Sequence, residues 1–406
     1  MSDIIRPADE DEMAAAIAAA AAQSRPLEVY GGGSKRDVGK PLQTAAHLST
    51  SALTGITLYE PNELVISARS GTPLSEIEKT LATNKQQLAF EPIDLGPLLG
   101  KNPGQGTIGA VFATNLSGSR RIHVGAARDH LLGLRAVNGQ GELFKSGGRV
   151  MKNVTGYDLC RGLAGSWGTL SVMSEVTMKV LPRAQATRTL ILRGLTDEVA
   201  VDAMCAAMGS PFEVSGTVHL HPSCAQAMGI DGLAKRGQSV TALRLENFSS
   251  FLDYRAGQLG KILAAFGKMA QLDTKQSAPL WDGIRALKFL EGGQGAVWRI
   301  SIAPTKAPQF VAAIAAQLEC RAAYDWSGGL IWLELTPTHD AGASEIRRTV
   351  AEIGGYATLL RAEPAVRAAV DVFQPLDGSV DMLTRRIKAA FDPAGILNPG
   401  RMYSGI

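Results

Sequence analysis

The chain has 406 residues, of which 45% are hydrophobic and 19% charged, and its formal net charge is +3. This length favours two or three domains with a substantial core. The small net charge, with no block of lysines and arginines, gives no electrostatic case for nucleic acid, and no stretch is long and apolar enough to predict a membrane span.

The N-terminal part alternates short strands, glycine turns and helices. Acidic residues at 9–12 precede the alanine-rich run Ala14–Ala22, a pattern typical of a helix with an acidic first turn and not of a signal peptide. Leu27–Gly33 predicts a strand that enters a glycine turn, and Leu64–Ala68 predicts another strand. A helix is expected to begin at Pro73, because proline suits the first helical turn.

The next segment predicts a loop, a short helix, a hairpin and a strand. Gly and Pro are dense over 92–103, which indicates a loop, and a short helix is expected over Thr107–Thr114. The Asn138-Gly139 pair predicts the turn of a β-hairpin. Leu170–Val180 alternates apolar and polar residues, which predicts a half-buried strand that ends at Pro182. We place the main domain boundary there.

The region from about 183 to 388 mixes strand-like runs with alanine-rich helices, which favours an α+β fold. The predicted strands lie at 187–195, 214–221, 296–304 and 328–337, and the predicted helices at 198–208, 255–272, 307–319 and 343–353. No internal repeat is evident in the sequence. The final segment predicts a helix that breaks at Asp392-Pro393 and is followed by a turn-rich tail.

Two glycine-rich segments are candidates for binding an anion. "YGGGSKRDVG" (30–39) matches neither a Walker A loop nor a dinucleotide fingerprint, because Lys35 and Arg36 stand where those patterns need other residues. Residues 104–109 do match G-x-G-x-x-G, with Asp129 twenty places further on. The prolines and glycines that precede them leave no room for the strand that a Rossmann turn requires.

Both segments together can be explained by one ligand. The first turn of the predicted helix at 107–114 offers backbone N–H groups to an anion, and Asn115 and Gly118 suit left-handed conformations at its end. Two loops that face one pyrophosphate explain both segments, whereas the alternative is two unrelated tight turns. A third glycine-rich segment, Lys152–Val172, would let a flat ring or a ribose approach the backbone.

Taken together, five segments resemble the FAD-binding proteins of the vanillyl-alcohol-oxidase type, the PCMH-type flavoproteins. Within these, the chain is most similar to the FAD-binding E subunits of bacterial glycolate oxidase (glycolate dehydrogenase). The segments are "YGGGSKRDVG", "EPNELVISARSGTPLSEIE", "TIGAVFATNLSGSRRIHVGAARDHLLGLRAVNGQGE", "VMKNVTGYDLCRGLAGSWGTLSV" and "FDPAGILNPGRMY". The resemblance implies an α+β fold, with a two-subdomain FAD-binding domain at 1–182, an α+β substrate or partner domain at 183–388, and a tail at 389–406 that returns to the flavin.

The resemblance also implies which residues bind FAD, without a covalent bond. In the first pyrophosphate loop the implied residues are Gly31, Gly32, Gly33 and Ser34. In the second loop they are Gly106, Thr107, Gly109 and Ala110. Those implied near the phosphate and ribityl chain are Thr114, Asn115 and Gly118, those at the adenine end are Gly165, Ser166, Thr169 and Val172, and those in the tail are Asn398 and Arg401. Lys35 fits either a place in this site or a solvated loop.

Residues for chemistry on a substrate are less evident. His219 and His221 share one face of a predicted strand, but two ligands make a poor metal site, and packing or surface roles explain them as well. Arg299, Arg361 and Trp326 are candidates for contacts with an anionic substrate, and each also fits a structural role. The four cysteines form no C-x-x-C pair, so neither a zinc ribbon nor an iron–sulfur cluster is indicated. No metal is expected, and the catalytic residues are left open.

The resemblance implies an FAD-dependent oxidoreductase subunit of a glycolate oxidase. Its implied partners are a homologous flavin-containing catalytic subunit, which oxidises glycolate to glyoxylate, and an iron–sulfur subunit that takes the electrons. This implies a cytoplasmic protein, or one held at the inner membrane through its partners. Two alternatives stay open: a stand-alone FAD-dependent 2-hydroxy-acid dehydrogenase of the D-lactate type, and a non-catalytic assembly subunit.

Overall fold

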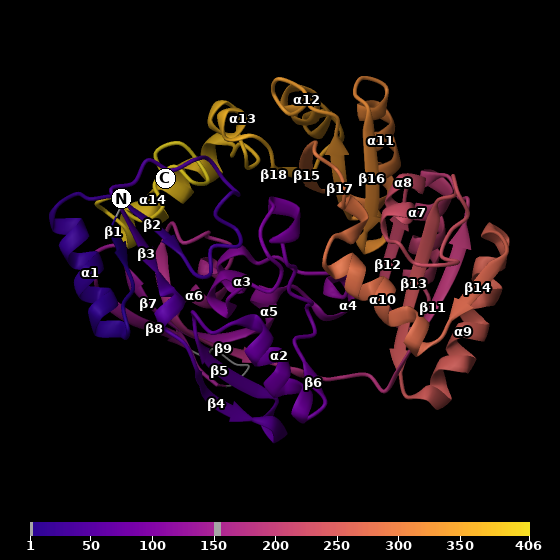
Figure 1. The fold of residues 1–406 in the computed structure, drawn as a ribbon, viewed down its shortest axis with the longest axis horizontal. Coiled ribbons are helices and arrows are strands. Elements are labelled where there is room, and N and C mark those ends of the chain that lie inside the picture. Colours follow the sequence, from indigo (N-terminus) through magenta and orange to yellow (C-terminus); the bar gives the residue numbers. More distant parts are fainter. Residues whose placement is uncertain (1–2, 150–155) are drawn as a thin grey trace. The chain divides into compact units, whose positions relative to one another are not determined.

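The computed structural model describes residues 3–149 and 156–406. The chain forms two compact units (Figure 1). The first comprises Met1–Ser117, Gly125–Arg183 and Pro375–Ile406, and the second comprises Gly118–Val124 and Ala184–Gln374. The long segment of the second unit therefore begins just after Pro182, while a short earlier segment also belongs to it and the C-terminal helix joins the first.

The first sheet of unit 1 is small and parallel. Its order is β1 (Asp3–Ile5), β3 (Ala46–Ser49), β2 (Leu27–Tyr30). Helix α1 (Glu10–Ala22) begins at Asp9, whose side chain accepts a hydrogen bond from the N–H of Glu12, and its first turn is acidic as the sequence predicts. Met13 and Ile17 of α1 pack with Leu27 and Leu48 of the sheet in one core cluster.

The second sheet of unit 1 has five antiparallel strands. Its order is β4 (Ile56–Glu60), β5 (Val65–Arg69), β9 (Ser171–Lys179), β7 (Leu131–Asn138), β8 (Leu143–Gly147). The helices that pack with this sheet include α2 (Leu74–Thr83), α3 (Ile108–Thr114), α5 (Ala127–His130) and α6 (Leu159–Leu163). The apolar face of α2, with Ile77 and Leu81, enters the same core as Ile66 and Val176 of the strands. The short strands β6 (Gln86–Gln87) and β10 (Leu181–Pro182) pair beside it.

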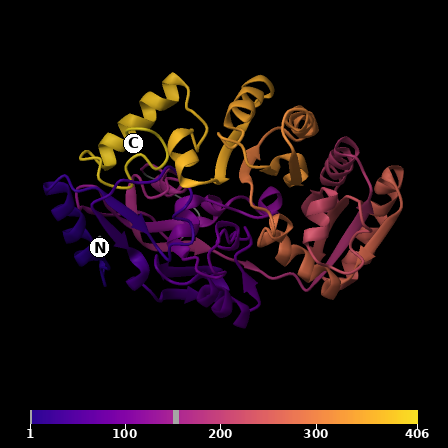
Figure 2. The same ribbon diagram turned by 45° about the horizontal axis from the view of Figure 1, so that its top comes forward.

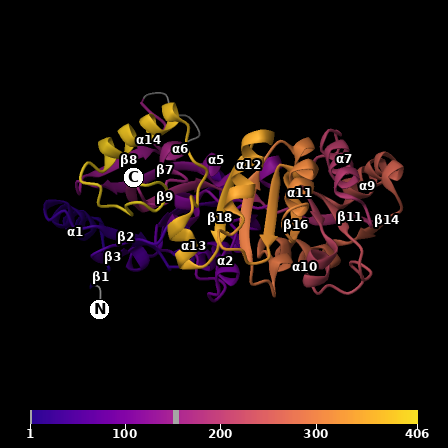
Figure 3. The ribbon, with the colours of Figure 1, turned by 90° about the horizontal axis from the view of Figure 1, so that it is seen from above.

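The C-terminal helix α14 (Gly378–Phe391) and the tail after it pack back onto unit 1 (Figures 2 and 3). Phe391 packs edge-to-face with Phe144 of β8, with ring centroids 5.9 Å apart. The buried Lys388 Nζ forms an ion pair with Asp392 at 2.6 Å and also donates to the carbonyl oxygen of Thr169 at 2.7 Å. Leu27 forms a parallel bridge with Leu397, so the tail runs alongside β2.

Unit 2 contains one antiparallel sheet of eight strands. In sheet order these are β14 (Met269–Leu272), β11 (Ala186–Arg193), β13 (Val240–Asn247), β12 (Val214–Leu220), β16 (Cys320–Asp325), β17 (Leu330–Leu335), β15 (Ala296–Ser301) and β18 (Tyr356–Arg361). The helices of this unit are α4 (Arg121–Val124), α7 (Asp197–Met208), α8 (Pro222–Ala227), α9 (Ser249–Leu263), α10 (Thr274–Arg285), α11 (Ala307–Ala315), α12 (Ala343–Ile353) and α13 (Pro364–Ala369).

This sheet is built from two copies of one βαββαβ topology. The first copy is β11–α7–β12–β13–α9–β14 and the second is β15–α11–β16–β17–α12–β18, and they join edge to edge through β12 and β16. The sequence shows no internal repeat, although the strand order of the sheet does repeat. The repeat lies in the order and pairing of the strands. Many different patterns of apolar residues are compatible with the same strand order.

Several predicted elements of unit 2 match the structure and others do not. The four predicted strands correspond to β11, β12, β15 and β17. The helix predicted over 255–272 is wrong at its end, because α9 stops at Leu263 and Met269–Leu272 pairs with β11 as strand β14. Strands β13, β16 and β18 were not predicted. Among the described residues, no helix is long and apolar enough to cross a membrane.

Candidate functional site

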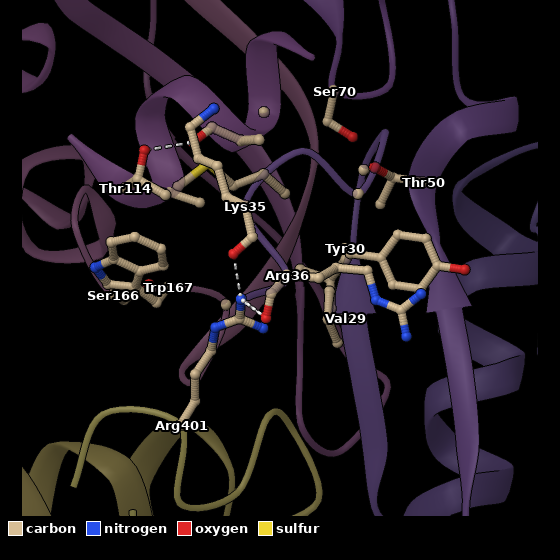
Figure 4. Close-up of a pocket in the computed structure, with 18 of the residues that line it drawn as sticks. Val29, Tyr30, Lys35, Arg36, Thr50, Ser70, Thr114, Ser166, Trp167 and Arg401 are labelled. Atoms are coloured by element: carbon tan, nitrogen blue, oxygen red, sulfur yellow. Dashed lines mark hydrogen bonds between the residues drawn. The ribbon is translucent and has the colours of Figure 1, made fainter. Parts of the chain in front are cut away.

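A cavity lies within unit 1 (Figure 4). Segments that are far apart in the sequence form its walls: the glycine loop after β2, helix α3, the turn and strand that lead through β9, and the C-terminal tail, together with Thr50 and Ser70. The lining residues are Val29, Tyr30, Gly31, Gly33, Ser34, Lys35, Arg36, Thr50, Ser70, Gly109, Ala110, Ala113, Thr114, Ser166, Trp167, Gly168, Ser171, Val172, Met173 and Arg401.

The three glycines of the first loop are required for different reasons. A Cβ on Gly31 would lie 2.2 Å from Thr107 Oγ1, and a Cβ on Gly32 would lie 2.1 Å from the carbonyl oxygen of Gln105. Gly33 has φ +83°, a left-handed conformation that favours glycine. The first loop therefore packs directly against the segment that leads into α3, which brings the two predicted glycine loops together.

Helix α3 offers fewer free backbone N–H groups to a ligand than its sequence suggests. The N–H of Ile108 donates to the carbonyl of Thr72 at 3.0 Å, and the N–H of Gly109 donates to the carbonyl of Ser70 at 2.8 Å. The expectation that the first turn offers free N–H groups is therefore wrong for Ile108 and Gly109, because the β5–α2 turn already accepts from both. Asn115 does end the helix in the predicted left-handed conformation, with φ 51°.

The turn before β9 is held against the end of α3. The N–H of Gly165 donates to Phe112 and that of Trp167 to Ala113, at 3.0 and 2.8 Å. Gly165, Trp167 and Gly168 all have positive φ, which lets the chain turn sharply at the cavity wall. This arrangement places Ser166 and the Trp167 indole at the cavity (Figure 4).

The C-terminal tail holds the segments that line the cavity in place through two side chains, Asn398 and Arg401. The buried Asn398 side chain accepts from the N–H of Val29 at 2.7 Å and donates to the carbonyl oxygens of Val29 and Trp167 at 3.2 and 2.9 Å. Arg401 donates from Nη2 to the carbonyl of Lys35 at 2.9 Å and lies over the Trp167 ring at 5.8 Å (Figure 4). Asn398 thus holds β2 and the turn together, and Arg401 holds the first loop.

Lys35 is one of the cationic residues that line the cavity, with Arg36 and Arg401. Its side chain is buried and extends across the cavity toward Thr114 (Figure 4), and it forms no hydrogen bond or ion pair through Nζ with any residue that the structure describes. Burial lowers the pKa of Lys35 to about 8, although Asp94 opposes the shift. Arg36 differs, because it forms an ion pair with Glu28 that raises its pKa.

Three buried hydroxyl groups at this site have no hydrogen-bond partner within the described ranges. Ser70 and Ser171 line the cavity, and Thr107 lies beside Gly31. Buried polar groups normally have partners, so these oxygens indicate places for ligand atoms. No Asp or Glu occurs among the described lining residues. Hydroxyl donors, one buried ammonium and apolar walls fit a dinucleotide with a diphosphate and a flat ring, and thus fit FAD.

The predicted cofactor residues divide into two groups by position. Those that line the cavity are Gly31, Gly33, Ser34, Gly109, Ala110, Thr114, Ser166, Val172 and Arg401. Those that do not line it are Gly32, Gly106, Thr107, Asn115, Gly118, Gly165, Thr169 and Asn398, of which Gly118 belongs to unit 2. Contacts of either group with a flavin stay predictions. The first part of one predicted segment, residues 150–155, lies outside the described residues.

Sequence reasoning missed several lining residues. Ser70 lies in the turn between β5 and α2, Thr50 follows β3, and Ser171 and Met173 are on β9. Thr50, Ser70 and Met173 lie outside the glycine-rich segments and Ser171 lies near the end of the third, so no local pattern marks these positions. A strand that enters a turn beside a predicted ligand loop is the signal that could have identified Ser70.

The two histidines of β12 belong to a separate cluster in unit 2. His221 donates from Nε2 to Asp197 at 3.0 Å, because its Nδ1 accepts from the N–H of Ala322. His219 is buried at 3.3 Å from Asp197, and burial lowers its pKa. The Tyr324 hydroxyl also donates to Asp197, at 2.5 Å. Within the described ranges, no group of three or more His, Cys, Asp or Glu residues is placed to hold a metal ion.

The fold and the cavity define a class of protein. An α+β unit without a Rossmann turn, in which two glycine loops meet at a cavity with unpaired hydroxyls, is a PCMH-type FAD-binding fold. Residues 2–147 match the FAD binding domain family, and residues 380–402 match the C-terminal domain of the FAD linked oxidases. The chain is thus an FAD-linked oxidoreductase that binds FAD.

Comparison with individual proteins narrows this class. The chain is 33% identical to glycolate oxidase subunit GlcE of Escherichia coli over 93% of both chains. It is 29% identical to a D-lactate dehydrogenase of Archaeoglobus fulgidus over 50% of this chain and 43% of that one. The chain belongs to the family of the glycolate oxidase subunit GlcE.

Solved structures share the fold at low identity. A 4-ethylphenol oxidase from Gulosibacter chungangensis matches with TM-score 0.70 and 13% identity, over 99% of this chain and 89% of that chain. An alkyldihydroxyacetonephosphate synthase matches with TM-score 0.68 and 17% identity, over 98% of this chain and 75% of that chain.

Proposed function

We propose that this chain is the FAD-binding subunit of a multi-subunit glycolate oxidase. In this proposal a two-electron oxidation converts glycolate to glyoxylate, the flavin accepts the electrons, and an iron–sulfur subunit takes them onward. A homologous flavin-containing subunit, of the kind that a relative named glycolate oxidase subunit GlcD represents, is the second partner. Association with a membrane, if it occurs, is through these partners.

One observation carries the cofactor part of the proposal. Ser70 and Ser171 present buried hydroxyls without partners to the same cavity that holds the buried Lys35 ammonium. These groups would hold the cofactor without a covalent bond, with the diphosphate between the two glycine loops. FAD supplies the two-electron acceptor, and the chain's own residues bind it, orient it and exclude water.

The identity to GlcE over nearly the whole chain supports glycolate as substrate. The D-lactate dehydrogenases that match cover about half of this chain or less, which gives the stand-alone 2-hydroxy-acid dehydrogenase less support. We take residues 1–182 and 389–406 as the flavin-binding part and 183–388 as the substrate or partner domain.

The test begins with the purified chain and its visible spectrum, followed by titration with FAD. We expect flavin absorbance that is released intact by denaturation, and an absence of flavin binding contradicts the proposal. Glycolate is then added to the chain alone and to the chain co-purified with its genomic neighbours. Reduction of the flavin only in the co-purified complex supports the subunit role, whereas reduction by D-lactate in the isolated chain favours the stand-alone dehydrogenase.

A further inference from the structure

Lys35 is the only amine among the described residues that line the cavity of unit 1. The protein holds both arginines of the lining: Arg36 forms an ion pair with Glu28, and Arg401 donates to the carbonyl oxygen of Lys35 at 2.9 Å. The Nζ atom of Lys35 forms no hydrogen bond or ion pair with any residue in the described ranges. In the flavin-free chain this amine therefore lies in the cavity without a protein partner.

The first glycine loop fixes the position of this amine. The carbonyl oxygen of Lys35 accepts from the N–H of Val38 at 3.2 Å as well as from Arg401, and the preceding Ser34 is buried. Lys35 itself is 6% exposed, and its side chain extends toward Thr114 of α3 (Figure 4). The side chain thus points into the cavity because its backbone is held, and it is not a solvated loop lysine.

Asp94 is the carboxylate whose charge acts on Lys35, and its two oxygens have other partners. Oδ1 accepts from the N–H of Gly96 at 2.9 Å, and Oδ2 accepts from the N–H of Gly104 at 2.7 Å. Burial lowers the pKa of Lys35 to about 8, and the charge of Asp94 opposes this shift only in part. At pH 8 about half of such a lysine is the neutral, nucleophilic amine, against under about 1% of an ordinary lysine.

We propose that Lys35 of the flavin-free chain is a modification site, at which an aldehyde that carries an anionic group forms a reversible imine. The neutral Nζ adds to the carbonyl carbon. One water then leaves with the carbonyl oxygen and the two amine protons, and a C=N bond remains, so no electrons are transferred. A desolvated lysine suits this chemistry. The unpartnered hydroxyls of Ser70 and Ser171 line the same cavity and can donate to the anionic group.

The inference rests on the proposed function in one respect, the natural aldehyde. Glyoxylate, the product in that proposal, is an aldehyde that carries a carboxylate. An imine at Lys35 occupies the cavity that FAD would enter, so modification and FAD loading exclude each other. Glyoxylate therefore slows the loading of the flavin-free chain and does not affect a chain that already holds FAD.

The experiment treats the flavin-free chain at pH 8 with pyridoxal 5′-phosphate and, separately, with glyoxylate. Cyanoborohydride traps the imine, and peptide mass spectrometry locates it. Lys35 is expected to react at least about tenfold faster than the exposed Lys79 of α2, because far more of its amine is neutral. Lys388 is the matched control: it is equally buried, but its Nζ donates to Thr169 and pairs with Asp392, so it should stay unmodified.

FAD provides the second measurement. Chain loaded with FAD, as its visible spectrum shows, should be protected at Lys35, and chain trapped at Lys35 should no longer bind FAD. Lys35→Arg keeps the charge but forms no imine, so its affinity for FAD should be the same before and after the treatment. Reaction of Lys35 no faster than Lys79, reaction of Lys388 as fast as Lys35, or equal reaction of the loaded chain overturns the inference. If Lys35→Arg does not fold, the labelling of the natural chain decides.

The outcome is separable from that of the proposed function. If pyridoxal 5′-phosphate modifies Lys35 selectively but neither the chain nor its complex oxidises glycolate, the reactive lysine stands and the proposed function fails. If glycolate reduces the flavin but Lys35 is not modified selectively, the function stands and this inference is wrong. Selective reaction with pyridoxal 5′-phosphate but none with glyoxylate keeps the site and overturns glyoxylate as its natural aldehyde.

Discussion

Gly31 and Thr107 lie so close together that the side chain at either position limits the side chain that the other can hold. A Cβ on Gly31 would be 2.2 Å from Thr107 Oγ1 and 3.3 Å from both Thr107 Cβ and Cγ2. Contacts under 3 Å force something to move. The contact between the two glycine loops therefore depends on a missing side chain, and the hydroxyl that occupies this space has no partner among the described residues.

Gly31→Ala should separate the two loops. We expect the free energy of unfolding to fall by about 1–3 kcal/mol, the usual cost of overpacking, and FAD affinity to fall as well. Thr107→Ala removes Oγ1 and Cγ2, so the double variant should recover much of the lost stability. Urea unfolding and FAD titration of the four proteins form a double-mutant cycle, and strictly additive effects would show that the two residues do not meet.

A carboxylate placed in the cavity should repel the diphosphate. Ala110 lines the cavity on α3, so Ala110→Asp is expected to abolish FAD binding, while Ala110→Asn has nearly the same shape and no charge. FAD titration checks both, and equal affinity for the two variants would mean that the diphosphate lies elsewhere. Gly109→Asp is a poorer test, because a Cβ there would be 2.6 Å from Ser70 Cβ and would disturb packing whether or not FAD binds.

Local signals in the sequence predicted much of unit 1. The Asn138-Gly139 turn and the left-handed Asn115 depend on neighbours in the chain, and both predictions are confirmed. The strand β9 is also confirmed, but the prediction that it is half-buried is wrong, because residues on both of its faces are buried. The family, the fold class and FAD could be predicted because the order of the glycine segments is specific. The hydrogen bonds of the Ile108 and Gly109 N–H groups could not be predicted, because their acceptors, the carbonyls of Thr72 and Ser70, belong to a different element.

In unit 2, local signals in the sequence did not predict several of the strands. The strands β13 and β16 lie inside a wide sheet and β18 lies at its edge, and most residues of all three are buried, so their apolar runs carry little periodic signal. Met269–Leu272 pairs as a strand because β11 lies beside it. Arg299 and Arg361 could not be distinguished in the sequence, since both follow strand-like patterns. Only the position of Glu334, which pairs with one and not the other, separates them.

Asn398→Ala should weaken the contact between β2 and the turn before β9 at the cavity. The substitution leaves the N–H and carbonyl of Val29 and the carbonyl of Trp167 without their side-chain partner, and Asn398 has a φ of 43° that alanine tolerates less well. We expect a loss of about 2–4 kcal/mol in unfolding free energy, with weaker FAD binding as a consequence. Asn398→Asp keeps the acceptor and loses the donors, so an intermediate loss is expected in urea unfolding. Full stability with weak FAD binding would instead indicate a direct contact with the flavin.

Lys35→Met should have opposite effects on the flavin-free and flavin-loaded protein. Since burial lowers the pKa of Lys35 to about 8 from its usual 10.5, the charged lysine destabilises the flavin-free protein below pH 8. Between pH 8 and 10.5 the unfolded chain holds the extra proton, so the contribution of this group to stability rises with pH over that window. Lys35→Met should therefore be the more stable flavin-free protein at pH 7.5, by at most about 3 kcal/mol, and the difference should shrink toward pH 10.

In the flavin-loaded protein, the same substitution removes the ammonium that the diphosphate would meet. FAD affinity at pH 7.5 should fall at least about tenfold in Lys35→Met, whereas riboflavin, which has no phosphate, should bind both proteins equally. Affinity of the natural chain for FAD should also decline above pH 8, because binding then requires uptake of a proton, and Lys35→Met should lack this decline. FAD titrations of both proteins from pH 7 to pH 10 check this. A parallel decline in the two proteins would assign the pH dependence to another group.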